Sequence, residues 1–189
     1  MIKKTFLFST ALLLVGCASA PQFYAPQQLE HNKHSYYLTS QQDLGTIAHY
    51  VYLPKKQNSK NWQSKLDVLW DRNKADWNLQ QRVAFRERAF ANTGVKYFQF
   101  EPQQDTLFAY VIYEPSPTNK DWQVDVAKGK QMGRCGFVQY QYSLKVPKSA
   151  KMKNMSSAKV ANYLKRYVVD KEMKKLREAD WVLECQTQP

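Results

Sequence analysis

Long apolar runs and glycine are both scarce in this chain of 189 residues. The most apolar stretch, from Phe6 to Val15, has 10 residues, whereas a helix that crosses a bilayer needs about 20. It therefore predicts no membrane-spanning helix. The 6 glycines leave little room for a phosphate-binding loop. The motifs Gly-x-Ser-x-Gly and His-Glu-x-x-His are also absent, which removes common signatures of serine hydrolases and zinc proteases.

A basic segment precedes this apolar stretch, and a cysteine follows it. Lys3 and Lys4 form the basic segment, and the stretch ends in Leu14-Val15-Gly16-Cys17. This tetrapeptide resembles the lipobox of bacterial lipoproteins, which is an aliphatic residue, a small or aliphatic residue, Gly, Ala or Ser, and then Cys. The resemblance implies that residues 1–16 are a cleaved signal peptide and that lipid is attached to Cys17. The alternative is an ordinary secretory signal with a chance cysteine.

The residues after the lipobox bear on the membrane that receives the protein. Ala18 and Ser19 follow Cys17, and the Asp that retains lipoproteins in the inner membrane is missing. The resemblance therefore implies the outer membrane, with the protein facing the periplasm. The first expected partner is the membrane itself, through the lipid on Cys17, because two or more acyl chains hold a protein stably.

Two cysteines remain after Cys17. An even pair in an oxidising compartment predicts a disulfide between Cys135 and Cys185. The chain-entropy model assigns about 4 kcal/mol to the closure of such a loop. The alternative is a pair of buried free thiols.

Positive charge is in excess, and it is unevenly distributed. The formal net charge is +12, and no Asp or Glu occurs between Val126 and Val169. Four lysines cluster around Pro147, and we expect them to contact an anionic surface, such as anionic lipid or lipopolysaccharide, or an envelope protein. These residues are Lys145, Lys148, Lys151 and Lys153. The alternative is a solvated face. The predicted periplasmic location argues against nucleic acid as the partner.

The remaining chain predicts a tether and one domain. Residues 17–35 are rich in Pro, Gln and Asn and predict a flexible tether, and residues 36–189 predict a single globular domain. β-rich patterns cover Tyr36–Thr39 and Ile47–Leu53. Later strands are predicted at Lys96–Phe100, Thr106–Tyr113, Trp122–Val126 and Gly136–Val146.

Three helices are predicted by 3.6-residue periodicity. The first begins near Ser59 and carries Trp62, Leu66, Leu69 and Trp70 on one face. The second is capped by Asp76 and ends at Gly94. The third extends from Ser157 to Glu178, with a stripe formed by Val160, Leu164, Tyr167, Val168 and Lys171. Adjacent strands with short links favour antiparallel pairing. The predicted class is therefore α+β: an antiparallel sheet with two helices inserted early and one long C-terminal helix packed on it.

The segment Gly133–Tyr140 resembles the cysteine segment of NlpC-type peptidoglycan hydrolases. Arg134 stands where that family has Asp, the Ser after the cysteine is missing, and all three histidines precede Cys135. A disulfide explains Cys135 more simply than a nucleophile does.

Other candidate sites carry weaker signals. His31-x-x-His34 has a metal-compatible spacing but lacks the three or four convergent ligands that a site needs, so we predict no metal site and no cofactor. The carboxylate pairs Glu101 with Asp105 and Asp121 with Asp125 are interpreted as solvated residues of loops and strand ends.

These observations favour a non-catalytic, periplasm-facing outer-membrane lipoprotein that binds or helps to assemble another envelope component. Two alternatives remain open. One is an envelope hydrolase that acts on peptidoglycan or lipid. The other is a small-ligand-binding lipoprotein with an aromatic pocket between the sheet and the helices.

Overall fold

The computed structural model describes residues 22–186. Eight strands form one antiparallel sheet in the order β2-β3-β4-β5-β9-β8-β7-β6. Their bounds are β2 (Gln28–His31), β3 (His34–Asp43), β4 (Ile47–Leu53), β5 (Ser64–Asp71), β6 (Tyr97–Gln103), β7 (Thr106–Tyr113), β8 (Trp122–Gln131) and β9 (Phe137–Val146). Two further strands, β1 (Gln22–Phe23) and β10 (Cys185–Gln186), pair with each other. Strand therefore dominates the α+β fold.

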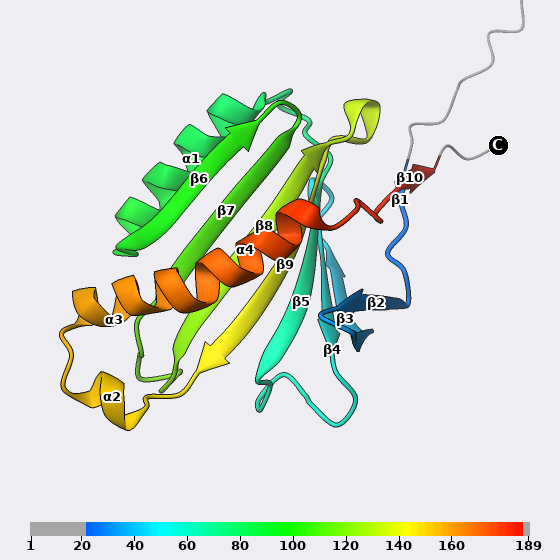
Figure 1. Cartoon of the computed structure of the whole chain (residues 1–189). Coiled ribbons are helices and arrows are strands. Elements are labelled where there is room, and N and C mark those ends of the chain that lie inside the picture. The colour runs from blue at the N-terminus through cyan, green and yellow to red at the C-terminus, as the bar shows by residue number, and fades with distance from the viewer. Residues whose placement is uncertain (1–21, 187–189) are drawn as a thin grey trace, which may run out of the picture.

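Helices cover the two faces of the large sheet (Figure 1). Helix α1 (Leu79–Asn92) lies on one face, and a long helix crosses the other. The long helix consists of α3 (Ser157–Leu164), the π-helical segment η2 (Lys165–Val169) and α4 (Asp170–Glu178). The short helices η1 (Gly133–Cys135) and α2 (Ala150–Lys153) lie at the two ends of β9. We call the two sides of the sheet the α1 face and the α4 face.

The alternation of β9 assigns its side chains to these faces. Val138, Tyr140 and Tyr142 belong to the main hydrophobic cluster on the α4 face, as the period of two predicts. The intervening Gln139 contacts α1 through Arg86, so it points to the α1 face. One side of this central strand is thus apolar and the other polar.

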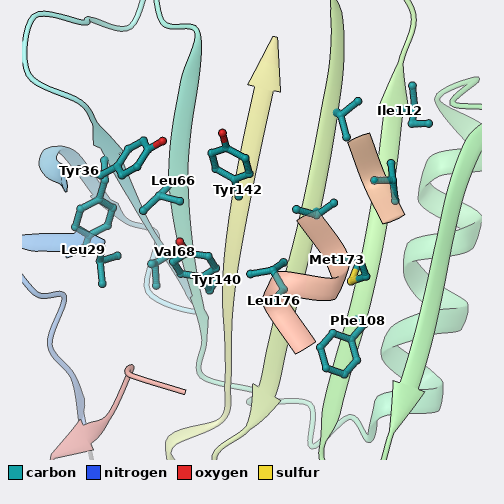
Figure 2. Packing of buried hydrophobic residues seen from close by; sticks show 14 of the residues in the cluster. Leu29, Tyr36, Leu66, Val68, Phe108, Ile112, Tyr140, Tyr142, Met173 and Leu176 are labelled. Carbon is teal, nitrogen blue, oxygen red and sulfur yellow. The ribbon is translucent and has the colours of Figure 1, made fainter. Parts of the chain in front are cut away.

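The main core lies between the α4 face and the long helix. Figure 2 shows Phe108, Ile112 and Tyr140 of the sheet near Met173 and Leu176 of α4. Leu29 and Tyr36, from the N-terminal strands, complete the same cluster. A smaller cluster of Leu79, Leu107 and Phe137 lies under α1.

The C-terminal helix has the predicted range, but its buried stripe differs from the predicted one. We expected Tyr167 and Lys171 to continue the stripe of Val160 and Leu164, yet both are exposed and Val169 and Met173 are buried instead. The π-helical segment η2 adds a residue to the turn and rotates the following helix relative to the preceding one. The periodicity of 3.6 residues therefore fails across Lys165–Val169.

Two predictions about the first half of the chain are wrong. The segment predicted as a helix from Ser59 contains strand β5, in which Leu66, Val68 and Trp70 are buried on one face. Only one early helix, α1, is therefore inserted before β6 among the described residues. The predicted tether, residues 17–35, is structured from Gln22 onward, because β1, β2 and the start of β3 lie in it.

The N-terminal segment is mostly polar in composition, but three of its side chains are buried, and their burial explains why the segment is structured. Phe23, Leu29 and His31 are buried against the sheet and the long helix. Cys17 and the predicted signal peptide lie outside the described residues. No helix in the described part of the chain is long and apolar enough to cross a membrane.

Candidate functional site

Two pockets lie on the α1 face, one on each side of α1. We call the first the Asp125 pocket; it has about 200 Å³, and its lining includes Phe90, Phe100, Tyr113 and Asp125. We call the second the Trp77 groove; it has about 350 Å³, and its lining includes Ile47, Leu69, Trp77 and Phe85. Arg86 lines both pockets. Its side chain therefore lies where the two hollows meet.

An arginine pair on α1 forms the floor between these pockets. Arg82 is 3% exposed, and its guanidinium contacts the Asp71 carboxylate at 2.5 Å and the Asn73 side-chain oxygen at 3.0 Å. Arg86, one helical turn later, donates to Oε1 of Gln139. Within residues 22–186, Arg86 makes no ion pair: the Asp71 carboxylate is bonded to Arg82, and Asp125, which lines one of the pockets, is hydrogen-bonded to Gln123 and Gln141.

Burial and the neighbouring Arg82 cation lower the pKa of Arg86 to about 10, although Asp71 opposes the change. The guanidinium remains charged at neutral pH. An unpaired cation with little water around it is costly, so an anionic ligand would stabilise this arrangement. Arg86 retains partial exposure, which leaves it accessible from the pockets that it lines.

Aromatic and glycine residues of the sheet hold the arginines in place. The Phe137 ring lies 4.3 Å from the guanidinium carbon of Arg82 and 5.5 Å from that of Arg86, within the range of cation–π attraction. Gly129 is directly beneath this ring, because a Cβ at that position would collide with Phe137. The small residue on β8 thus allows the large ring on β9 to support α1.

Asp125 brings a second buried charge to the α1 face. Gln123 and Gln141 donate to its two oxygens at 2.9 and 3.0 Å. Burial raises the pKa of Asp125 to about 6, although hydrogen bonds from Gln123 and Ser143 oppose the change. The carboxyl therefore titrates near neutrality, and it lines the same pocket as Arg86.

Helix α1 is positioned by its own sequence as well as by these contacts. Asn78, rather than the predicted Asp76, is the N-cap, and its side chain and that of Gln81 form a reciprocal capping box. Gly94 follows the helix with φ of +75°, as the predicted stop requires. Leu79 packs against Leu107 and Phe137 in the smaller cluster.

The predicted cysteine pair is joined. Cys135 and Cys185 form a disulfide with a Cα–Cα distance of 6.3 Å. Cys135 ends η1 and is followed by strand β9, whereas the NlpC-type cysteine precedes a helix. Its sulfur is bonded in this structure and is not available as a nucleophile. The lipidation site predicted at Cys17 lies outside the described residues.

The four predicted contact lysines lie at the far end of β9 from this disulfide (Figure 1). Lys148, Lys151 and Lys153 are exposed, and Lys145 is partly covered. Lys145 lies over the Trp62 ring and Lys151 over the Tyr163 ring. None of the four makes an ion pair in the described part of the chain. We call this group the basic loop.

The two histidines of the His31-x-x-His34 spacing lie in β2 and β3; His31 is buried and packs against the core, whereas His34 is exposed. His31 is opposite His34 in the strand register, and its ring stacks on Tyr142 with centroids 4.0 Å apart. Its Nδ1 lies 2.9 Å from the Tyr140 hydroxyl, and its Nε2 lies 3.5 Å from Glu172. Among residues 22–186, no group of three or more His, Cys, Asp or Glu could hold a metal ion.

The carboxylates that we considered as pairs are separate in the structure. Glu101 pairs with Arg177 of α4 at 2.6 Å, and Asp105 lies 3.5 Å from Lys130. Asp125 lines the Asp125 pocket on the α1 face, while Asp121 precedes β8. Neither pair forms one site, and the interpretation of Asp125 as a solvated strand-end residue is wrong, because it is buried within β8.

The α1 face thus carries an arginine, Arg86, that lines two pockets and makes no ion pair among the described residues. The chain belongs to a protein family whose model matches residues 23–181. It is also similar to an uncharacterised protein of Haemophilus influenzae, with 45% identity over 192 residues, which covers 98% of this chain and 100% of that protein. No solved structure matches the chain.

Our sequence interpretation missed the arginine pair. A signal was present, because Arg82 and Arg86 lie three and seven residues after Leu79, on the stripe that also includes Val83 and Phe90. Charged residues on the apolar stripe of a helix indicate a buried polar contact. The partner Gln139 could not be found this way, since it lies 53 residues away.

Proposed function

We propose that this protein is an outer-membrane lipoprotein, anchored through lipid on Cys17 and facing the periplasm, that binds an anionic envelope component without transforming it. The observation that carries the binding function is Arg86, a largely buried cation without an ion-pair partner among the described residues, at the junction of two pockets. The lipobox resemblance supports the anchor.

The short distance between the lipobox and the fold restricts the position of the domain. The chain from Cys17 to Gln22, the first residue of β1, spans at most about 18 Å when fully extended. The β1–β10 end of the domain therefore lies next to the membrane in this proposal. We expected a longer flexible tether, which would have allowed more freedom.

The basic loop is a second contact in this proposal. Strand β9 has 10 residues, which corresponds to a length of about 33 Å, and it separates the disulfide end from the basic loop. When the domain stands upright on its anchor, the basic loop points into the periplasm. It contacts anionic lipid of the anchoring leaflet only when the domain lies on its side.

One experiment tests the binding function. The mature chain from residue 17, with Cys17→Ser, is incubated with a detergent-free extract of envelope small molecules and isolated again, and bound molecules are identified by mass spectrometry. We expect an anionic molecule on the parent and its loss in Arg86→Gln. If Arg86→Gln retains the same molecules as the parent, or if the parent retains none, the binding function is wrong.

A matched control distinguishes the pocket from general charge. The variant in which Lys145, Lys148, Lys151 and Lys153 are all changed to Gln removes four cations far from α1, and it should keep the bound molecule. The same variant tests the basic loop. It should lose binding of anionic vesicles at low salt, where screening is weak, and vesicle binding equal to that of the parent would exclude the contact.

A further inference from the structure

We infer that the ligand of the α1 face is a single-chain amphiphile with a carboxylate head group, whose head pairs with Arg86 and whose acyl chain lies in the Trp77 groove. This inference rests on the proposed binding function and adds the chemical class of the ligand.

The apolar character of the groove is the first part of the evidence. Phe85 of α1 is 48% exposed, and its ring centroid lies 4.9 Å from that of Trp77. Ile47 of β4 and Leu69 of β5 also line the groove. Exposed aromatic pairs that line a hollow mark a binding surface, and the volume of about 350 Å³ is within the range of small-ligand pockets.

The segment that carries Trp77 is held rigidly. The Asn73 side chain donates to the Trp77 carbonyl and accepts from the Trp77 amide, both at 2.9 Å. The same Asn73 side chain accepts from Arg82 at 3.0 Å. The groove wall and its charged floor therefore belong to one hydrogen-bonded unit, which reduces the entropy lost when a ligand binds.

The charge of the floor selects the head group. Arg82 is buried and its charge is neutralised by Asp71, whereas Arg86 is partly exposed and makes no ion pair among the described residues. Asp125 lines the other pocket and not the Trp77 groove, so Arg86 offers the groove one guanidinium charge, which matches a monoanion. A guanidinium also matches a carboxylate geometrically, since both are planar and can form two parallel hydrogen bonds. A dianionic phosphate would place its second charge close to Asp71. Lys74, at the exposed rim of the groove, remains solvated and contributes less.

The test uses saturated fatty acids of increasing length as probes, namely butanoate, hexanoate, octanoate and decanoate, below their aggregation concentrations. Binding to the mature Cys17→Ser chain is measured by calorimetry, with Trp fluorescence as a second readout. Each added CH₂ should raise the affinity roughly fourfold, because burial of a methylene contributes about 0.8 kcal/mol. The gain should cease once the groove is filled.

Head-group variants test the pairing with Arg86. Octanoate should bind at least tenfold more tightly than octanol, and Arg86→Gln should remove that difference. Octyl phosphate should bind more weakly than octanoate. If octyl phosphate binds more tightly, or if octanol binds equally well, the carboxylate assignment is overturned.

Groove variants test the position of the chain. Phe85→Ala should reduce the dependence on chain length and leave the fold intact, since the ring is half exposed. Tyr167→Ala, which removes a ring that is 54% exposed on the long helix, is the matched control and should change nothing. If an Arg86-dependent anion binds without any dependence on chain length, the inference is wrong and the proposed function stands. If Arg86 affects no anion at all, both are wrong.

Discussion

The two faces of the sheet use the same strands in opposite ways. On the α4 face, Val138, Tyr140 and Tyr142 of β9 pack into the main core with the long helix and the N-terminal strands, and Tyr140 also lines a pocket of about 200 Å³ there. On the α1 face, Gln139 and Gln141 of the same strand are polar and line the Asp125 pocket, and Gln139 accepts a hydrogen bond from Arg86. The first face carries the main core, and the second carries the charged side chains of Arg86 and Asp125 beside a pocket. The proposed binding function therefore belongs to the face where charge, and not apolar packing, distinguishes the hollows.

The largest difference between the faces should appear when the core of the α4 face is truncated. Leu164 is fully buried between α3 and the sheet, and Leu164→Ala should lower the free energy of unfolding by about 2–5 kcal/mol because it leaves a cavity. Urea unfolding measures this loss. Asn162→Ala, at an exposed position of the same helix, should change the free energy by less than about 0.5 kcal/mol. Equal effects of the two substitutions would contradict the assignment of the core.

A smaller effect is expected from Glu172, which fastens the N-terminal strands to α4. Burial alone would raise its pKa, but hydrogen bonds from His31, Asn32 and Lys175 lower the pKa to about 2. Because this pKa is lower in the folded chain than in the unfolded chain, the carboxylate stabilises the fold fully above about pH 4.5. This contribution is lost as the pH falls toward 2.

Glu172→Gln should therefore lower stability at pH 7 by roughly 1–2 kcal/mol and weaken the acid dependence below pH 4.5. Urea unfolding at pH 7, 4.5 and 3 measures both effects. A variant with the parent's pH profile would show that the Glu172 contacts do not control the acid sensitivity of the domain.

The smallest effect should have the opposite sign and lie on the α1 face. The pKa of Asp125 is raised to about 6, so the folded chain binds a proton more readily than the unfolded chain. The contribution of Asp125 to stability is then most favourable at low pH and declines as the pH rises through the interval from about 4 to 6. Asp125→Asn keeps one acceptor for the Gln123 and Gln141 amides and removes the buried charge.

This substitution should raise the free energy of unfolding by about 1 kcal/mol at pH 8 and by much less at pH 4. Parallel urea titrations at the two pH values provide the measurement. Destabilisation at pH 8 would show that the Asp125 carboxylate charge stabilises the fold through its hydrogen bonds with Gln123 and Gln141. The polar residues of the α1 face would then stabilise the fold as the apolar residues of the α4 face do.

Much of the fold was predictable because its signals are local. The alternation at Gly136–Val146 and the periodicity of Ser157–Glu178 identify β9 and the long helix, and Gly94 ends α1 as expected. The segment from Ser59 to Asp71 misled us because Trp62, Leu66, Leu69 and Trp70 also fit a helix. Tertiary pairing of β5 with both β4 and β9 decided the outcome there.

The site was less predictable because its parts are distant in sequence. Arg86 on α1 meets Gln139 on β9, and only the fold joins Phe85 to Ile47 across the Trp77 groove. The disulfide was the exception, since three cysteines and a predicted export signal leave one pairing after lipidation. The tether was wrong from Gln22 onward because Phe23 and Leu29 are isolated apolar residues in a polar segment, and their burial depends on surfaces formed much later in the chain.

The pairing of β1 with β10 also determines how the domain would respond to a pulling force. A load applied to the chain before Gln22 reaches the β1–β10 pair first, where only two residues of each strand are paired. Since the disulfide connects Cys185 to Cys135, β10 is covalently fastened next to β9, the strand between β5 and β8. β1 would therefore separate from β10, which the disulfide holds in place, while the large sheet stays intact. The short β1–β10 pair would be the first part of the domain to open under load, and it would form again when the load is removed.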